Sequence, residues 1–458
     1  MGKIVLQMSQ HGRCTSQLAC LSYIIRSNLE KRSEKNREVF SPFLLPINIS
    51  RRMRKPNAIV QDDYFSQTTK LQKEVENEVE TIYEQQEDDS NDLEVLFSKA
   101  HSRYIEKYLT MPLPYFYASL DCNHGWMLYW LTNSFAIIND TLIPEESELI
   151  KKKIKRNIVN GGLGGISGGV HQIGHAASTY LSVLSLLLAE DYSTLEKIRS
   201  NLYKWFLQLK NPDGSFRMHE NGESDARSVY CVLCVAYLLN ILTEELSRDT
   251  LKWLNKCQTF EGGFGGLPHT ESHGGYSFCA MACYFILLNP KDGAFLTQIE
   301  QQIDFQLFIR WAVMRQYQIE GGLSGRTNKL VDVCYSFWIG ALYPMISLAL
   351  GRVDSIFQRS ALNAYILKCC QRREGGFKDK PGKSVDFYHT NYALCGLSMA
   401  NHTYWFNFSE NKYQTFASLI DAANTESQIK VTAVCPITGI PLEVKRKCAR
   451  HFFSFKHA

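Results

Sequence analysis

The pattern of apolar and polar residues predicts a long helical region in this chain. Between about residues 95 and 425, apolar or amphipathic stretches alternate with glycine-rich turns. Residues 181–189 and 230–242 are apolar almost all round, which predicts helices that are buried on every side. Residues 198–209 carry apolar residues at helical spacing with polar residues between them, so this helix is expected to have one face in solvent.

Glycine-bearing turns recur along this region at intervals of roughly 50 to 60 residues, which indicates a repeated structural unit. The turns contain Gly161-Gly162, Asp213-Gly214, Gly262-Gly263, Gly321-Gly322 and Gly375-Gly376. In three of them a Glu-Gly-Gly sequence follows a glutamine by about three residues; these glutamines are Gln258, Gln318 and Gln371. Two helices fit into each interval, and glycine supplies the left-handed backbone that ends a helix.

Alternating buried and half-exposed helices favour an all-α barrel with an inner and an outer ring. An open solenoid of helical hairpins has the same periodicity and remains the alternative. We expect three regions: an N-terminal extension and polar linker at 1–94, partly disordered, the helical domain at 95–425, and a tail at 426–458. Residues 51–92 are polar and charged, which favours a mobile arm followed by a solvated helix or linker. The tail is expected to pack on the surface or to be partly disordered.

The bulk composition excludes several classes of function. The chain has 458 residues, and its net charge of +4 results from 50 basic and 46 acidic residues. A charge so nearly balanced does not indicate binding to nucleic acid or to an anionic membrane. No secretory signal and no apolar run long enough to cross a membrane is found, so the 14 cysteines are expected to be reduced, buried or metal-bound in a cytoplasmic protein. Residues 1–29 contain no acid, which leaves a mitochondrial presequence as the alternative to a nonessential extension.

Two segments, 320–342 and 374–397, contain residues that could bind a metal. Asp332 and Cys334 stand two residues apart, and both are zinc ligands when ionised. Such a pair often arises by chance, as a capping aspartate beside a buried cysteine. His389 is a candidate third ligand, although a single histidine is more often part of a core. Three ligands without a fourth leave an open position, which is typical of catalytic zinc.

These two segments, together with residues 225–231 and 272–279, resemble the β subunit of protein farnesyltransferase. The matching motifs keep their order and spacing over about residues 95 to 425. The resemblance implies an α/α (α6-α6) barrel of inner and outer helix rings. It also implies zinc-dependent transfer of a farnesyl group from farnesyl diphosphate to the cysteine thiol of C-terminal CaaX motifs, within an obligate heterodimer with an α subunit.

The resemblance also implies roles for individual residues. The zinc ligands would be Asp332, Cys334 and His389, and the diphosphate-binding groups His273, Arg326, Lys329 and Tyr335. The walls of the lipid pocket would be Trp126, Arg227, Tyr230, Tyr276, Cys279, Trp338 and Tyr392, with Trp126 and Tyr392 closing its end. Asp379 would hold Mg²⁺ against the diphosphate. Taken singly, each aromatic residue is better explained as core, Arg326 and Lys329 as surface charges, and Asp379 as a turn residue.

Positions that would contact the peptide substrate are Trp126, Trp130, His175 and Tyr388. The chain departs from the family pattern at Cys122, Asn123 and Ser178, where Ala, Ser and Pro are expected, so the preference at the last substrate residue stays open.

Two other functions and one other metal motif are alternatives to this assignment. A type I protein geranylgeranyltransferase is expected to carry Lys in place of Asp379. A non-catalytic helical scaffold would not need the three metal ligands. The acidic sequence at 88–92 matches a magnesium motif of prenyl synthases but lies in the polar linker.

Overall fold

The computed structural model describes residues 66–87, 95–138, 142–288, 294–352, 355–406, 415–419 and 429–453. Contacts between residues divide the chain after Lys70, and the barrel belongs to the unit formed by residues 71–458. The predicted mobile arm, the presequence alternative and the acidic motif at 88–92 lie outside the described residues.

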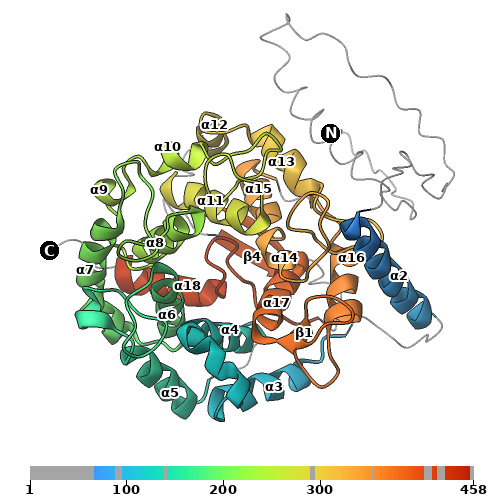
Figure 1. The fold of residues 1–458 in the computed structure, drawn as a ribbon, viewed down its shortest axis with the longest axis horizontal. Helices are drawn as coiled ribbons and strands as arrows, with labels where there is room; N and C mark the ends of the chain where they lie inside the picture. The colour runs from blue at the N-terminus through green and yellow to red at the C-terminus, as the bar shows by residue number, and fades with distance from the viewer. Residues whose placement is uncertain are drawn as a thin grey trace, which may run out of the picture. The chain divides into compact units, whose positions relative to one another are not determined.

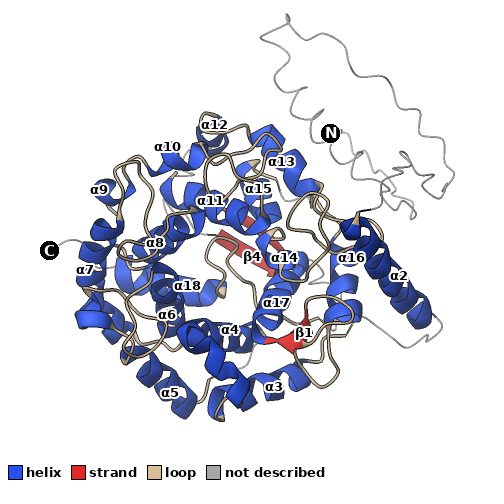
Figure 2. Ribbon diagram, viewed as in Figure 1, coloured by secondary structure: helices blue, strands red, loops and turns tan. Residues whose placement is uncertain are grey.

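Helices form two concentric rings around a common centre (Figures 1 and 2). The inner ring consists of α4 (His124–Ile137), α6 (Ala176–Leu188), α8 (Ala226–Leu238), α11 (Gly274–Leu287), α14 (Tyr335–Trp338) with α15 (Leu342–Ala349), and α17 (Phe387–Asn401). The outer ring consists of α3 (Ser98–Thr110), α5 (Pro144–Lys155), α7 (Tyr192–Leu209), α9 (Glu244–Ser247) with α10 (Thr250–Asn255), α12 (Phe295–Glu300) with α13 (Phe305–Val313), and α16 (Arg359–Ala364) with η4 (Tyr365–Cys370). Because α17 packs against α4, the inner ring is closed, and the predicted α/α barrel is confirmed.

The burial of the helices follows the pattern of the sequence. Every residue of α6 from Ala176 to Leu187 is buried, as expected for an inner helix that contacts neighbours on all sides. In α7 the buried residues follow helical spacing, and the remaining face is polar and accessible. Asp191 begins α7 by accepting a hydrogen bond from the backbone N–H of Thr194. The expected contrast between buried and half-exposed helices is therefore confirmed.

A glutamine side chain joins each of three glycine turns to the next outer helix. Gln258 donates to the carbonyl oxygens of Gly262 (3.1 Å) and Asp304 (2.9 Å) and accepts from the N–H of Asp304 (2.9 Å). In the following repeat Gln316 makes the corresponding bonds, with Gly321 and Gln358. The sequence pattern singled out Gln318 in this turn, but Gln316 makes the bonds, because the turn has one more residue between the glutamine and the glycine.

The third glutamine, Gln371, follows the last outer helix and bonds the segment before α3, the first outer helix, so its hydrogen bonds close the outer ring. Gln371 accepts from the N–H of Phe97 (2.9 Å) and donates to the carbonyl of Val95 (2.9 Å). His101 accepts at Nδ1 from the N–H of Gly376, so its Nε2–H donates to Gln371. Burial lowers the pKa of His101 to about 4, which keeps this ring neutral.

The C-terminal segment fills the barrel instead of covering its surface. The carbonyls of Ile437, Thr438 and Gly439 accept from Tyr230 (2.9 Å), Tyr180 (3.3 Å) and Asn133 (2.9 Å), respectively. Val434, Cys435 and Ile440 are fully buried, and α18 (Leu442–Phe453) then packs against α8 and α6. The predicted surface position of the tail is therefore wrong for these residues. The prolines and glycine of the tail form a tight turn, and the backbone carbonyls of this turn accept hydrogen bonds from side chains of the inner helices.

The remaining elements are small. Strand β1 (Phe377–Lys378) pairs antiparallel with β2 (Val385–Asp386), with Phe377 opposite Asp386, and β3 (His402–Phe406) pairs with β4 (Thr415–Leu419), with His402 opposite Leu419. Turn η1 (Tyr115–Asn123) precedes α4, and η2 (Val159–Gly162) follows α5. Within the described residues, no helix has the length and apolarity that a membrane span requires.

Helix α2 spans Gln67–Glu87, and in its part from residue 71 onward Val75 and Val79 are buried, whereas the sequence predicted a solvated helix or linker. Gln72 donates to the Glu320 carboxylate (2.6 Å), and Tyr83 donates to the carbonyl of the same residue (2.8 Å). The side chain of Val79 is fully buried.

We expect Gly375→Ala to destabilise the protein more than Gly351→Ala. Both glycines have positive φ, +107° and +63°, so both substitutions should cost about 1 to 2 kcal/mol of backbone strain. A Cβ at residue 375 would also lie 2.4 Å from the carbonyl oxygen of Ala100, whereas one at residue 351 would meet nothing within 4 Å. Denaturant unfolding should show at least about 2 kcal/mol of additional destabilisation at residue 375; equal losses would contradict the tight closure.

Candidate active site

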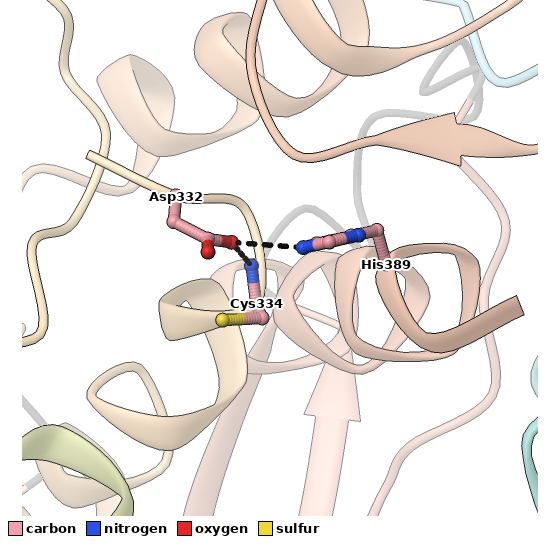
Figure 3. A group of neighbouring side chains, drawn as sticks. All are labelled: Asp332, Cys334 and His389. Carbon is pink, nitrogen blue, oxygen red and sulfur yellow. Dashed lines mark hydrogen bonds and ion pairs between the residues drawn. The ribbon is translucent and has the colours of Figure 1, made fainter. Parts of the chain in front are cut away.

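Three side chains of metal-binding type converge on one point of the barrel. The ligand atoms of Asp332, Cys334 and His389 all lie within 4.8 Å of one another (Figure 3). Asp332 and Cys334 come from the loop that leads into α14, and His389 comes from the first turn of α17. Asp332 Oδ1 lies 3.4 Å from His389 Nε2.

The backbone fixes the direction of each of these side chains. Asp332 Oδ1 accepts from the N–H of Cys334 (2.8 Å), which holds the carboxylate over the start of α14. Asp386 begins α17 by accepting from the N–H of His389 (2.8 Å), and its other oxygen bonds His389 Nδ1 (2.6 Å). Because Nδ1 is engaged in this way, Nε2 is the nitrogen that faces Asp332.

Asp386 is a further candidate for the site, and the sequence pattern alone did not indicate it. A carboxylate that bonds the outer nitrogen of a metal-binding histidine fixes its tautomer and raises its basicity. The sequence signal was available, since an aspartate three residues before a histidine can cap a helix and reach the ring at the same time.

Without a metal, protons take part in holding the cluster together. Burial disfavours a charged imidazole, but the hydrogen bonds to Asp332 and Asp386 outweigh it and raise the pKa of His389 to about 10. Burial also opposes the charge of Asp332, yet the bond from His389 holds the pKa of Asp332 below its ordinary value. Burial, reinforced by Asp332, raises the pKa of the Cys334 thiol well above its ordinary value. A divalent cation would replace the protons of the thiol and the imidazolium, so the donor set of oxygen, sulfur and nitrogen fits such an ion.

A further carboxylate, Asp379, lies beside this cluster. Its backbone carbonyl accepts from the N–H of Val333 (2.9 Å), between two of the candidate ligands. Its Oδ2 is bonded by Lys380, while its Oδ1 is buried and has no hydrogen-bond partner among the described residues. Burial and the charge of Asp332 raise the pKa of Asp379. An unpartnered buried carboxylate oxygen fits a second cation.

The candidate diphosphate-binding residues lie next to the cluster, at the start of α11 and α14. His273 begins α11 and accepts at Nδ1 from the N–H of Gly275 (3.0 Å), so its Nε2–H faces the Tyr335 hydroxyl, 3.1 Å away. Burial and the charge of Arg326 lower the pKa of His273 to about 4, so the ring is neutral. Arg326 itself is half-exposed and pairs with Glu271 (3.1 Å).

Lys329 is exposed, and the structure does not join it to this group of residues. Its backbone carbonyl accepts a hydrogen bond from Tyr317 (2.8 Å).

A row of aromatic rings extends from the cluster across α4, α14 and α17. Trp126 packs against Trp130 with ring centroids 5.4 Å apart, and Trp130 contacts Tyr388 at the same distance. Trp338 donates from Nε1 to the Tyr388 hydroxyl (3.0 Å) and lies 4.4 Å from Tyr392. The structure therefore brings together three of the predicted lipid-wall residues, Trp126, Trp338 and Tyr392.

The other predicted wall residues lie on α8 and α11. Arg227 is held by Asp225 and lies over the ring of Tyr276 (5.7 Å), which contacts His273. Cys279 is buried, as is Tyr230, whose hydroxyl is bonded to Tyr180 and to the tail carbonyl of Ile437. His175, a predicted peptide-contacting residue, begins α6, and its ring centroid lies 5.7 Å from that of His219 in the loop before α8.

Comparison with known proteins agrees with the geometry. Residues 96–440 match the model of the prenyltransferase alpha-alpha toroid domain. Protein farnesyltransferase subunit beta of Schizosaccharomyces pombe is 42% identical over 322 residues, which cover 68% of this chain and 80% of that protein. The chain belongs to this family of prenyltransferase β subunits. Its relative in Saccharomyces cerevisiae, also named protein farnesyltransferase subunit beta, is 37% identical over 385 residues, covering 82% of this chain and 85% of the relative.

A solved structure supports the fold of the family. Candida albicans protein geranylgeranyltransferase-I complexed with GGPP superimposes with a TM-score of 0.62 and covers 78% of this chain and 99% of the solved chain. At 20% sequence identity this likeness concerns the fold alone.

We expect Asp386→Asn to weaken metal binding about 10- to 100-fold, because it removes the charge behind His389 but keeps a side-chain oxygen to cap α17. Asp304→Asn is the matched control, since Asp304 caps α13 in the same way (2.9 Å to the N–H of Leu307) outside the cluster. Metal content would be measured by elemental analysis during dialysis against a chelator. Equal retention in the two variants would count against the role given to Asp386.

Proposed function

We propose that this chain is the catalytic β subunit of a protein farnesyltransferase, working in an obligate heterodimer with an α subunit in the cytoplasm. It would transfer farnesyl from farnesyl diphosphate to the cysteine thiol of proteins that end in a CaaX motif. The observation that carries the proposal is the convergence of Asp332, Cys334 and His389 within 4.8 Å. Relatives named as farnesyltransferase β subunits support the choice of lipid.

We infer that the metal held by these three residues is zinc, because carboxylate, thiolate and imidazole together are typical zinc ligands. Bound zinc supplies a fourth coordination position at which a substrate thiol is ionised at neutral pH. The three residues hold the ion, and Asp386 keeps the imidazole of His389 in the tautomer that can bind it.

The residues at the start of α11 and α14 are proposed to bind the diphosphate. Neutral His273 offers its Nε2–H, Tyr335 its hydroxyl, and Arg326 and Lys329 their positive charges, all of which stabilise an anionic leaving group. In the reaction a carbon–sulfur bond forms at the first carbon of the lipid, and the bond from that carbon to the diphosphate oxygen breaks. The electron pair of that bond leaves with the diphosphate, and Mg²⁺ held by Asp379 would share its charge.

The aromatic row is proposed to limit the length of the lipid. A geranylgeranyl chain has one more isoprene than farnesyl, and burying those five carbons would yield up to about 4 kcal/mol at about 0.8 kcal/mol per carbon. Trp126 and Tyr392 are proposed to exclude that unit. Because burial alone would favour the longer lipid, selection of farnesyl requires bulky rings that exclude the extra isoprene sterically.

The direct test of the function is co-expression with an α subunit, followed by transfer assays with both lipids onto peptides that end in a CaaX motif. Farnesyl transfer that requires both subunits is the expected result. Transfer of geranylgeranyl in preference to farnesyl would favour the type I geranylgeranyltransferase alternative, and no transfer of either lipid would favour a binding scaffold.

We expect Cys334→Ala to reduce zinc from about one ion per chain to almost none, because two remaining ligands hold zinc poorly. Cys283→Ala is the control, since Cys283 is a fully buried thiol on α11 that does not belong to the cluster. Elemental analysis of both purified variants measures the effect. Full zinc retention in Cys334→Ala would refute this ligand assignment.

We expect Trp126→Thr to raise the ratio of kcat/KM for geranylgeranyl diphosphate over that for farnesyl diphosphate by at least about tenfold, since one excluded methylene is already worth several-fold discrimination. Trp405→Thr is the control, because Trp405 lies on β3, beyond the opposite end of α17. A ratio that stays the same in Trp126→Thr would remove this residue from the pocket wall.

A further inference from the structure

Asp379 and Lys380 form an ion pair that is only half satisfied. The Lys380 ammonium bonds Asp379 Oδ2, and the side chains are only 10% and 19% exposed, respectively. Asp379 Oδ1 is buried and finds no hydrogen-bond partner within the described residues. One oxygen of this carboxylate is therefore neutralised by a cation from its own chain, while the other is left without a donor.

The backbone holds this pair close to the metal cluster. The carbonyl of Asp379 accepts from Val333, whose neighbours on either side are the candidate ligands Asp332 and Cys334. Lys380 follows β1 and begins the turn that returns to β2, and its carbonyl accepts from the N–H of Lys383 (3.3 Å). The main chain at both residues is fixed, so the flexible part of the pair is the lysine side chain.

We propose that Lys380 is a built-in counter-ion on Oδ2 of Asp379, and that its charge sets the affinity of the free Oδ1 for a divalent cation that arrives with the diphosphate. The inference rests on the proposed function, in which Asp379 holds Mg²⁺. A lysine ammonium and a divalent cation cannot both bind the same carboxylate oxygen at contact distance. The cation would therefore bind the free Oδ1, next to the ammonium on Oδ2, and repulsion between the two positive charges would weaken its binding.

The counter-ion affects two steps in opposite directions. With Lys380 in place, Asp379 presents little net charge, so a diphosphate can approach without a metal. Without Lys380, the bare carboxylate repels the diphosphate but attracts the divalent cation more strongly. Lys380 thus acts as a positioning residue for Asp379. Its removal should raise the affinity for the metal and lower the affinity for the lipid diphosphate.

The test uses the heterodimer with a non-reactive farnesyl diphosphate analogue and Mn²⁺ as a spectroscopic probe for the divalent site. In Lys380→Met, which keeps most of the buried stem, the Kd for Mn²⁺ measured by electron paramagnetic resonance should fall about tenfold. The metal-free Kd for the analogue should rise by a similar factor. Lys380→Arg keeps the charge and should change both constants much less.

The matched control is Lys383→Gln, which removes a positive charge from an exposed side chain three residues away and should leave both constants unchanged. Lys380→Gln provides a second variant if Lys380→Met does not assemble with its partner. Unchanged Mn²⁺ affinity in both Lys380 variants, with binding still abolished by Asp379→Asn, would overturn the counter-ion role and leave the proposed function intact. Mn²⁺ binding that survives Asp379→Asn would overturn both the counter-ion role and the assignment of Asp379 as the residue that holds Mg²⁺.

Discussion

Hydrogen bonds between the Gln371 side chain and the backbone at Val95 and Phe97 hold the two ends of the barrel domain together. The partners are more than 270 residues apart in the sequence. Because the entropy of closing so long a segment grows only logarithmically with its length, a few buried hydrogen bonds and packed helices can stabilise it. Closure holds α17 between α14 and α4, and this position brings His389 to Asp332. The candidate metal site thus depends on contacts that its own side chains do not make.

Inner helices meet at the site through their N-terminal ends. His273 begins α11 and touches Tyr335 at the start of α14, while Asp332 and Cys334 precede α14 and meet the first turn of α17. The unpaired N–H groups of helix starts favour anions, so this end of the barrel is suited to a thiolate and a diphosphate. The same side chains cap helices and form the site, which couples the local geometry of each helix start to the chemistry.

The sequence was sufficient for the parts of the molecule that follow periodicity. The almost entirely apolar stretch 181–189 predicted an inner helix and the amphipathic stretch 198–209 an outer one, while glycines such as Gly262 predicted the turns. Prediction from the sequence failed where a side chain bonds a backbone group that is distant in the chain. Gln316 and not Gln318 bonds the next helix, and the turn around Thr438 lies inside the barrel because Tyr180 and Tyr230 supply donors. The proximity of Asp332 to His389 came from family resemblance, since no local pattern connects them.

The position of the turn at residues 437–439 has a consequence for how the molecule is made. Its carbonyls are bonded by tyrosines and an asparagine from α4, α6 and α8, so the centre of the barrel is completed by a segment that is synthesised after all of the inner helices. Until then, the hydroxyls of Tyr180 and Tyr230 lack their backbone acceptors, and apolar inner faces remain uncovered. A nascent chain is therefore exposed to chaperones until this segment has been made, and a stop codon before it would remove part of the core.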